Sequence, residues 1–173
     1  AVGGPAANQL TAFIRKGGES ISYELRTWNG QTWTPVEGSE KTSGFSMKDG
    51  KCVVVINDKD VWAGKYHWDG TQWSSSGMEL TSALRLDATH IYATAKKVLY
   101  RYVDNKWEQI QKFDKRYYLL GGNRSGQLVL SDKNITGNYP FSLKLVSGAD
   151  TAAAAIEPLP AVPQNILGST WTL

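Results

Sequence analysis

The sequence contains little cysteine, few histidines and no long apolar run. A single cysteine, Cys52, among 173 residues excludes an internal disulfide and a cysteine-rich metal site. No apolar run approaches the roughly 20 residues that a helix needs to cross a bilayer, so we expect no membrane span. The two histidines, His67 and His90, lack the spacing of metal ligands. We therefore expect neither a metal nor another cofactor.

An excess of charge of one sign is also missing. Nineteen Lys and Arg residues stand against sixteen Asp and Glu residues, a net charge of +3 that is scattered along the chain. Binding to a phosphate backbone calls for a basic patch or stripe, so we expect no nucleic-acid partner. The carboxylates that a catalytic pair would use lie in expected turns or on exposed strand faces: Asp69, Asp87, Asp104 and Glu108. Without a convergent acid, base or nucleophile, we expect no enzyme and no catalytic residue.

The residues that are abundant favour sheets and turns over helices. Seventeen Gly, seven Trp and eight Tyr stand against two Met and four Phe. Tryptophan and tyrosine are enriched in strands, and glycine is the residue of tight turns. The composition therefore predicts an all-β chain.

The strongest pattern is an internal repeat made of an aromatic residue, a turn and a tryptophan. It stands at residues 28–33 as WNGQTW, at 68–73 as WDGTQW and, more loosely, at 102–107 as YVDNKW. Asn-Gly and Asp-Gly supply the positive φ that hairpin turns require, so each unit predicts two strands joined at that turn. The tryptophans that end the units, Trp33, Trp73 and Trp107, lie 40 and then 34 residues apart. A propeller blade of four strands takes roughly 40 to 50 residues.

Further strand candidates extend the repeat to most of the chain. We expect strands near 21–27, 51–56, 61–67 and 98–102, with a further candidate at 44–47, and turns at Asn29-Gly30 and Asp69-Gly70. The fold expected is a β-propeller-type module of about four blades, built from repeated four-stranded antiparallel sheets, over residues 1–147. Its repeats fall near 10–40, 43–77 and 80–112, with a degenerate fourth at 113–147. Residues 148–173 are rich in alanine and proline, and they predict a strap followed by a terminal strand.

The stretch from Ile14 and Arg15 through the first turn resembles the repeat of bacterial and fungal propeller lectins, including the fucose-binding type. In that family a Trp-Asp-Gly-x-x-Trp turn recurs in every blade, and the resemblance covers about residues 10 to 110. It implies that sugars bind between blades, held by an arginine, by an acidic residue three positions before the first tryptophan, and by the aromatic residues. Arg15 stands at the arginine position. Four residues match the aromatic positions: Trp28, Trp33, Trp68 and Trp73.

The acidic position of that family is not matched here. It is occupied by Leu25, Lys65 and Leu99. Glu24 lies one residue away, which predicts that its side chain is on the opposite face of the strand. A site of the fucose-binding type is therefore not predicted, although the repeat itself still favours a sugar-binding propeller.

The recurring aromatic residues have two interpretations. An indole face packs well on the apolar side of a sugar ring, but a repeated core also needs a tryptophan at the same place in every repeat. We expect blade packing for Trp33, Trp73 and Trp107. The residues next to the turns are the candidates for contact with ligand: Trp28, Trp68 and Tyr102. Their expected polar neighbours are Arg15, Glu24 and Tyr66.

The sequence thus predicts a non-catalytic binding module, secreted to the extracellular space, whose partner is a glycan or a protein surface. The alternative is a structural or protein-docking propeller segment of a larger secreted or toxin-like assembly. A four-bladed hemopexin-like module is a further architectural alternative, because Tyr100-Arg101-Tyr102 loosely resembles its blade pattern. Open sheet edges would have to be covered, so we expect either a closed four-bladed monomer, an oligomer or a longer parent chain.

Overall fold

The computed structural model describes residues 1–6, 8–17, 22–41, 52–132, 142–149 and 155–158. These residues form strands and turns without a helix, which confirms the all-β prediction. Within these ranges there is accordingly no helix of the length and apolarity that would cross a bilayer.

The strands form four antiparallel sheets of four strands each, and in every sheet the strands lie side by side in chain order. The first sheet holds β1 (Val2–Ala6), β2 (Gln9–Lys16), β3 (Ser22–Trp28) and β4 (Trp33–Pro35). The second holds β5 (Val53–Asn57), β6 (Asp60–Ala63), β7 (Tyr66–Trp68) and β8 (Trp73–Ser75). The third holds β9 (Leu80–Arg85), β10 (Ile91–Ala95), β11 (Val98–Val103) and β12 (Lys106–Lys112). The fourth holds β13 (Tyr118–Gly122), β14 (Leu128–Ser131), β15 (Leu143–Ser147) and β16 (Ala155–Pro158).

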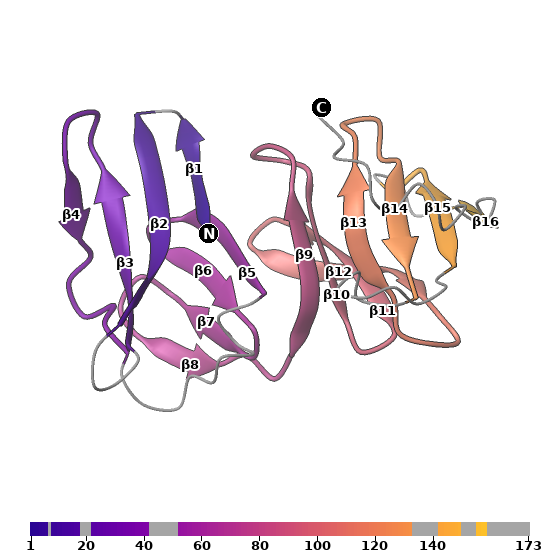
Figure 1. Ribbon diagram of the computed structural model, residues 1–173, viewed down its shortest axis with the longest axis horizontal. Helices are drawn as coiled ribbons and strands as arrows, with labels where there is room; N and C mark the ends of the chain where they lie inside the picture. Colours follow the sequence, from indigo (N-terminus) through magenta and orange to yellow (C-terminus); the bar gives the residue numbers. More distant parts are fainter. Residues whose placement is uncertain (7, 18–21, 42–51, 133–141, 150–154, 159–173) are drawn as a thin grey trace.

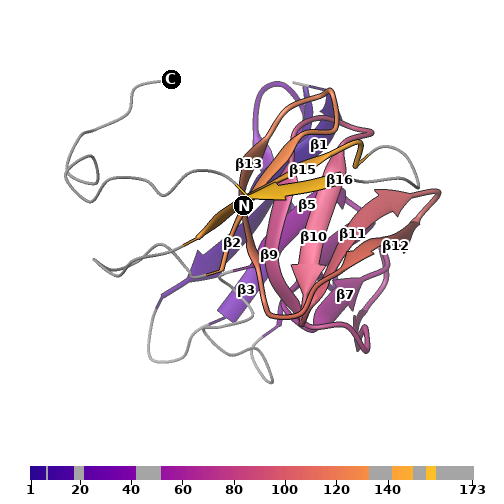
Figure 2. The ribbon, with the colours of Figure 1, turned by 90° about the vertical axis from the view of Figure 1, so that its right-hand side faces the viewer.

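The sheets follow one another in chain order, with their first strands turned inward. Strands β1 and β2 pack against β5, β5 against β9, and β9 and β10 against β13. The last strands of the first and fourth sheets, β4 and β16, lie at opposite ends of the long axis (Figure 1). Figure 2 views the molecule from the end that carries the fourth sheet, with β16 in the foreground. The two terminal sheets are therefore separated by the second and third.

Three hydrophobic cores fill the spaces between consecutive sheets. Phe13 and Leu25 of the first sheet pack with Val61 and Trp68 of the second. The next two cores join the second sheet to the third, through residues such as Val54, Ile91 and Tyr102, and the third to the fourth, through Tyr92, Leu99, Leu130 and Val146. Because strand residues alternate between the two faces of a sheet, the second and third sheets each contribute one face to either neighbour.

Several expected strands are confirmed and others are corrected. The strands at 21–27, 51–56 and 98–102 correspond to β3, β5 and β11. The single strand expected at 61–67 is wrong, because Gly64, with φ +56°, turns the chain between β6 and β7. Strand β1 was not expected, so the first sheet begins at Val2 rather than near residue 10. The fourth sheet extends past residue 147 through β16. The strand expected at 44–47 and the terminal strand expected near the end of 148–173 lie outside the described residues.

The inward strands are tied together by Arg85, at the end of β9. Its Nη2 donates to the carbonyl of Gly4 at 2.7 Å, and its Nη1 donates to the carbonyls of Ile56, at 2.8 Å, and Val55. One guanidinium group of the third sheet thus bonds to both the first and the second sheets. A Cβ on Gly3 would collide with the Val55 carbonyl, so glycine is needed where β1 approaches β5.

Candidate functional site

The repeated turns have the geometry that their sequence predicts. Gly30 and Gly70 have φ of +98° and +93°, and the preceding side chains hold the turns. Asn29 Oδ1 accepts the backbone N–H groups of residues 31 and 32 at 3.0 and 2.9 Å. Asp69 Oδ1 accepts those of residues 71 and 72 at 2.8 and 2.9 Å. The Thr71 hydroxyl and these backbone N–H groups lower the pKa of Asp69 to about 2.

Each turn brings the two aromatic residues of its repeat into a directly opposed pair on neighbouring strands. Trp28 pairs with Trp33, and Trp68 with Trp73. In the third sheet Tyr102 pairs with Trp107. The three pairs occupy equivalent places in three consecutive sheets. The burial of each pair can therefore be compared with that of the other two.

The pair of the second sheet is covered by the first sheet. Trp68 is fully buried, at 0% exposure. Trp73 donates from Nε1 to the Ser39 carbonyl, at 2.8 Å, and its ring lies edge-on to Phe13 at 6.0 Å. Packing between repeats was expected for Trp73, and its ring packs between the first and second sheets. Trp68 was a candidate for contact with ligand, but it is buried because the preceding sheet covers it.

The pair of the third sheet is covered by the second sheet in the same way. Trp107 lies edge-on to Trp62 at 5.7 Å, which confirms its expected packing role. Tyr102, the third candidate for contact with ligand, is only 7% exposed. Its hydroxyl donates to Asp60, and burial together with this bond raises the pKa of Tyr102. Asp60 is buried and also accepts from Trp62 Nε1 at 2.8 Å.

The pair of the first sheet lies on the face turned away from the second sheet. Trp28 and Trp33 contact each other, with ring centroids 5.5 Å apart. Trp33 is 37% exposed, so the packing between blades expected for it is not observed. Trp28 is half-buried. The first pair is thus the most accessible of the three.

A hollow of about 500 Å³ lies beside Trp28, and we call it the Trp28 hollow. Its walls come from the turn between β1 and β2, the end of β3 and the turn between β5 and β6. Its lining residues are Asn8, Gln9, Leu10, Thr11, Thr27, Trp28, Asn29 and Asp58. Among the described residues, the lining combines Trp28 with amide and hydroxyl residues and one carboxylate, and it includes no lysine or arginine.

The buried Trp68 helps to build the wall of this hollow. Its Nε1 donates to the carbonyl of Asp58 at 2.9 Å. In the same turn, Asn57 Oδ1 accepts the N–H of Lys59 at 2.8 Å. These two bonds fix the turn that carries Asp58. Trp68, which was expected to contact ligand, therefore acts as a positioning residue for the hollow.

The polar neighbours expected for a sugar site do not meet at Trp28. Leu10 is opposite Trp28 and Arg15 is opposite Tyr23, so at about 3.3 Å per residue Arg15 lies roughly 16 Å along the sheet. Glu24 is 5% exposed and is bound by Arg26 Nε at 2.6 Å and Lys16 Nζ at 2.8 Å. Lys16, and then Arg26, lower the pKa of Glu24.

Tyr66 is also placed elsewhere. The ammonium groups of Lys41 and Lys65 lie 5.1 and 5.2 Å from the centre of its ring, in the range of cation–π contacts. The expected site therefore separates into distinct places: Trp28 in the hollow, Arg15 and Glu24 at the other end of the first sheet, and Tyr66 on the second sheet. The hollow residues Gln9 and Asp58 were not expected from the sequence, because neither belongs to the repeated motif.

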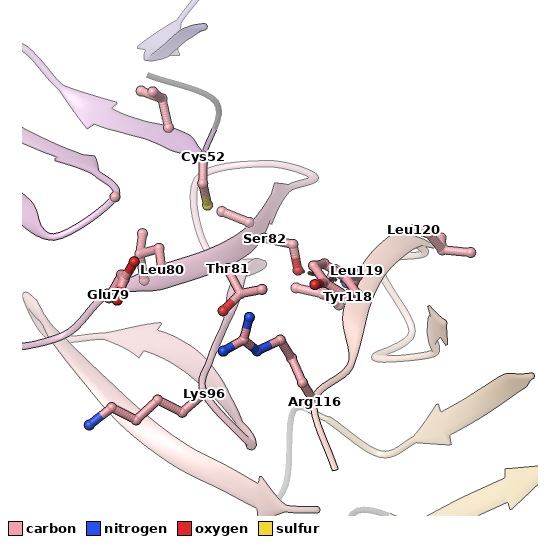
Figure 3. Close-up of a pocket in the computed structure, with 13 residues that line it drawn as sticks. Cys52, Glu79, Leu80, Thr81, Ser82, Lys96, Arg116, Tyr118, Leu119 and Leu120 are labelled. Atoms are coloured by element: carbon pink, nitrogen blue, oxygen red, sulfur yellow. Dashed lines mark hydrogen bonds between the residues drawn. The ribbon is translucent and has the colours of Figure 1, made fainter. Parts of the chain in front are cut away.

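A second hollow, of about 520 Å³, lies among β5, β9 and β13. Figure 3 shows Arg116 extending toward Thr81, with Lys96 and Glu79 at the same opening. Cys52 also lines it, but burial raises the pKa of that thiol to about 12, which keeps it protonated and unreactive. Across the described ranges, no three His, Cys, Asp or Glu side chains gather as metal ligands would.

Comparison with known proteins gave no matching family model, no matching curated protein and no matching solved structure.

Proposed function

We propose that the chain is a non-catalytic carbohydrate-binding module, and that the Trp28 hollow is its sugar site. The observation that carries the proposal is the composition of the hollow, which the half-buried Trp28 lines together with amide, hydroxyl and carboxylate residues. Sugar rings present an apolar CH face and a rim of hydroxyls, which match an aromatic ring and such polar groups.

The lining also indicates which sugars to expect. Among the described residues of the lining, Asp58 is the only charged one, so an acidic sugar would meet a carboxylate there and no described cation. Like charges at close range are unfavourable where water is partly displaced. The ligand class proposed is therefore a neutral glycan, bound through hydroxyls to Gln9, Asn8 and Asp58.

The finer architecture that we propose is of the β-propeller type. Supporting it are the repeated four-stranded meanders, the inward position of each first strand and the packing of each sheet on the next. Propeller blades have this strand order and this face-to-face packing. The extracellular location and the likeness to propeller lectins stay predictions of the sequence.

A glycan array on the purified chain tests the proposal, followed by titration of the best neutral ligand. Replacing Gln9→Ala or Asp58→Asn removes a polar partner, and each replacement should weaken binding several-fold, since a hydrogen bond contributes about 0.5–1.5 kcal/mol. Gln109→Ala and Asp104→Asn change the same residue types on exposed parts of the third sheet. These controls should bind like the unmodified chain. If no glycan binds at millimolar concentration, or if hollow and control variants bind alike, the proposal is wrong.

A second candidate function is that of a structural or docking segment in a larger assembly. The uncovered pair Trp28 and Trp33 favours it, because the equivalent pairs are covered by the preceding sheet. The two candidate functions share Trp28, which lines the hollow and also contacts Trp33. The hollow includes Thr11 and Thr27, which lie on the face toward the second sheet, whereas Trp33 lies on the opposite face.

A further inference from the structure

Two of the three contacts between consecutive sheets, the first with the second and the second with the third, follow one rule. The face of each sheet that points toward the next one covers the aromatic pair of that next sheet. The first sheet covers Trp68 and Trp73, and the second covers Tyr102 and Trp107. A partner that covers Trp28 and Trp33 should therefore present a sheet face like those that cover the second and third pairs.

The face that awaits such a partner is the outer face of the first sheet. Leu25 belongs to the core shared with the second sheet, so by alternation Trp28 points the other way. Leu10 and Trp33, which flank Trp28 on the adjacent strands, share that face. Toward the opposite end of the strands, the same face carries the ion pairs of Glu24 with Lys16 and Arg26. We call this surface the leading face.

The chain also carries a face of the covering kind, on the outer side of its fourth sheet. Leu128 and Val146 are paired and belong to the core with the third sheet. Their neighbours Val129 and Leu145 are also directly paired and therefore point away from that core. Both are apolar and half-buried. We call this surface the trailing face.

We propose that the leading face of one copy docks on the trailing face of a second copy. The proposal rests on the docking candidate, and its leading face shares Leu10 and Trp28 with the lining of the Trp28 hollow. One chain does not join its own two faces, since β4 and β16 lie at opposite ends of the molecule (Figure 1). Contacts between unlike faces close into a ring when the rotation between copies permits. In a pair of copies related by a twofold axis, the leading face of each copy would meet the trailing face of the other, which gives two equivalent contacts.

Size-exclusion chromatography with light scattering measures the mass of the full chain in solution and so tests the proposal. We expect twice the chain mass of 19.1 kDa. Trp33→Lys and Val129→Lys each place a charge in both contacts of the pair, and each should return the mass to one chain. Gln109→Lys adds the same charge to an exposed position of the third sheet and should leave the mass doubled. Far-UV circular dichroism checks that each variant is folded, and Leu145→Lys replaces Val129→Lys if the latter is not.

Mixing the two monomeric variants distinguishes unlike faces from like faces. A Trp33→Lys copy retains an intact trailing face, and a Val129→Lys copy retains an intact leading face. Equal amounts should therefore regenerate one contact and a two-chain mass. If Val129→Lys alone stays dimeric, the contact joins two leading faces and the proposal is wrong. A single-chain mass for the unmodified protein at the highest attainable concentration also overturns it. Glycan binding is scored separately through Gln9, so either proposal can fail alone.

Discussion

Trp68 and Trp33 belong to equivalent repeats, yet truncating Trp68 should destabilise the fold far more than truncating Trp33. Trp68 is 0% exposed and lies in the core between the first and second sheets, whereas Trp33 is 37% exposed. Truncating a large buried aromatic side chain to alanine costs about 3–5 kcal/mol. Trp68→Ala also leaves the Asp58 carbonyl without its indole donor, so we expect the upper part of that range. Surface replacements generally change stability by less than about 1 kcal/mol.

Urea unfolding followed by far-UV circular dichroism measures the difference, at a concentration low enough to exclude association. Thermal melting should show it as well, because 1 kcal/mol shifts the midpoint of a domain of this size by roughly 2–4 °C. We expect a loss of roughly 6–20 °C for Trp68→Ala and less than about 4 °C for Trp33→Ala. Equal losses for the two variants would refute the assignment of Trp68 to the core and of Trp33 to the surface.

Three further changes test other contacts. Arg85→Met keeps the apolar stem but removes the side-chain donors to four carbonyls, so we expect a loss of about 2–4 kcal/mol in the same urea titration. Tyr102→Phe deprives the buried Asp60 carboxylate of one donor, which should cost about 1–3 kcal/mol; a loss no larger than for Tyr118→Phe would contradict this. The pKa of Asp69 is lowered from 3.8 to about 2, so its contribution to stability is present above pH 4 and lost as the pH falls through 2. Asp69→Asn preserves the turn, as Asn29 does in the first repeat, and should make unfolding less sensitive to acid between pH 4 and 2.

Local chemistry made part of this structure predictable. The turns after Trp28 and Trp68 need only a glycine and a side-chain acceptor within a few residues, and both were recognisable in the sequence. Strand β1 was not, because two glycines and a proline within Val2–Ala6 oppose strand formation. It pairs with β2, packs on β5 and accepts a hydrogen bond at Gly4 from Arg85, which is distant in sequence.

The candidate site was less predictable than the fold. Trp28 and Trp68 begin the same sequence motif. Trp68 is buried because the first sheet covers it, whereas Trp28 belongs to the first sheet and has no preceding sheet in the described part of the chain. Alternation along the strand did separate Glu24 from the face of Leu25, as expected. The hollow itself depends on Asp58, which a tertiary hydrogen bond from Trp68 holds in place. No local pattern contains that information.

The rule that each sheet covers the aromatic pair of its successor has a consequence for how such a chain can lengthen. A duplicated unit inserted between two sheets would have its own pair covered from in front, and it would cover the pair behind it. The number of uncovered faces would stay the same, one at each end of the row. Units of this kind can therefore be added or lost singly during evolution without creating a new exposed core, and only the closure of the row limits their number.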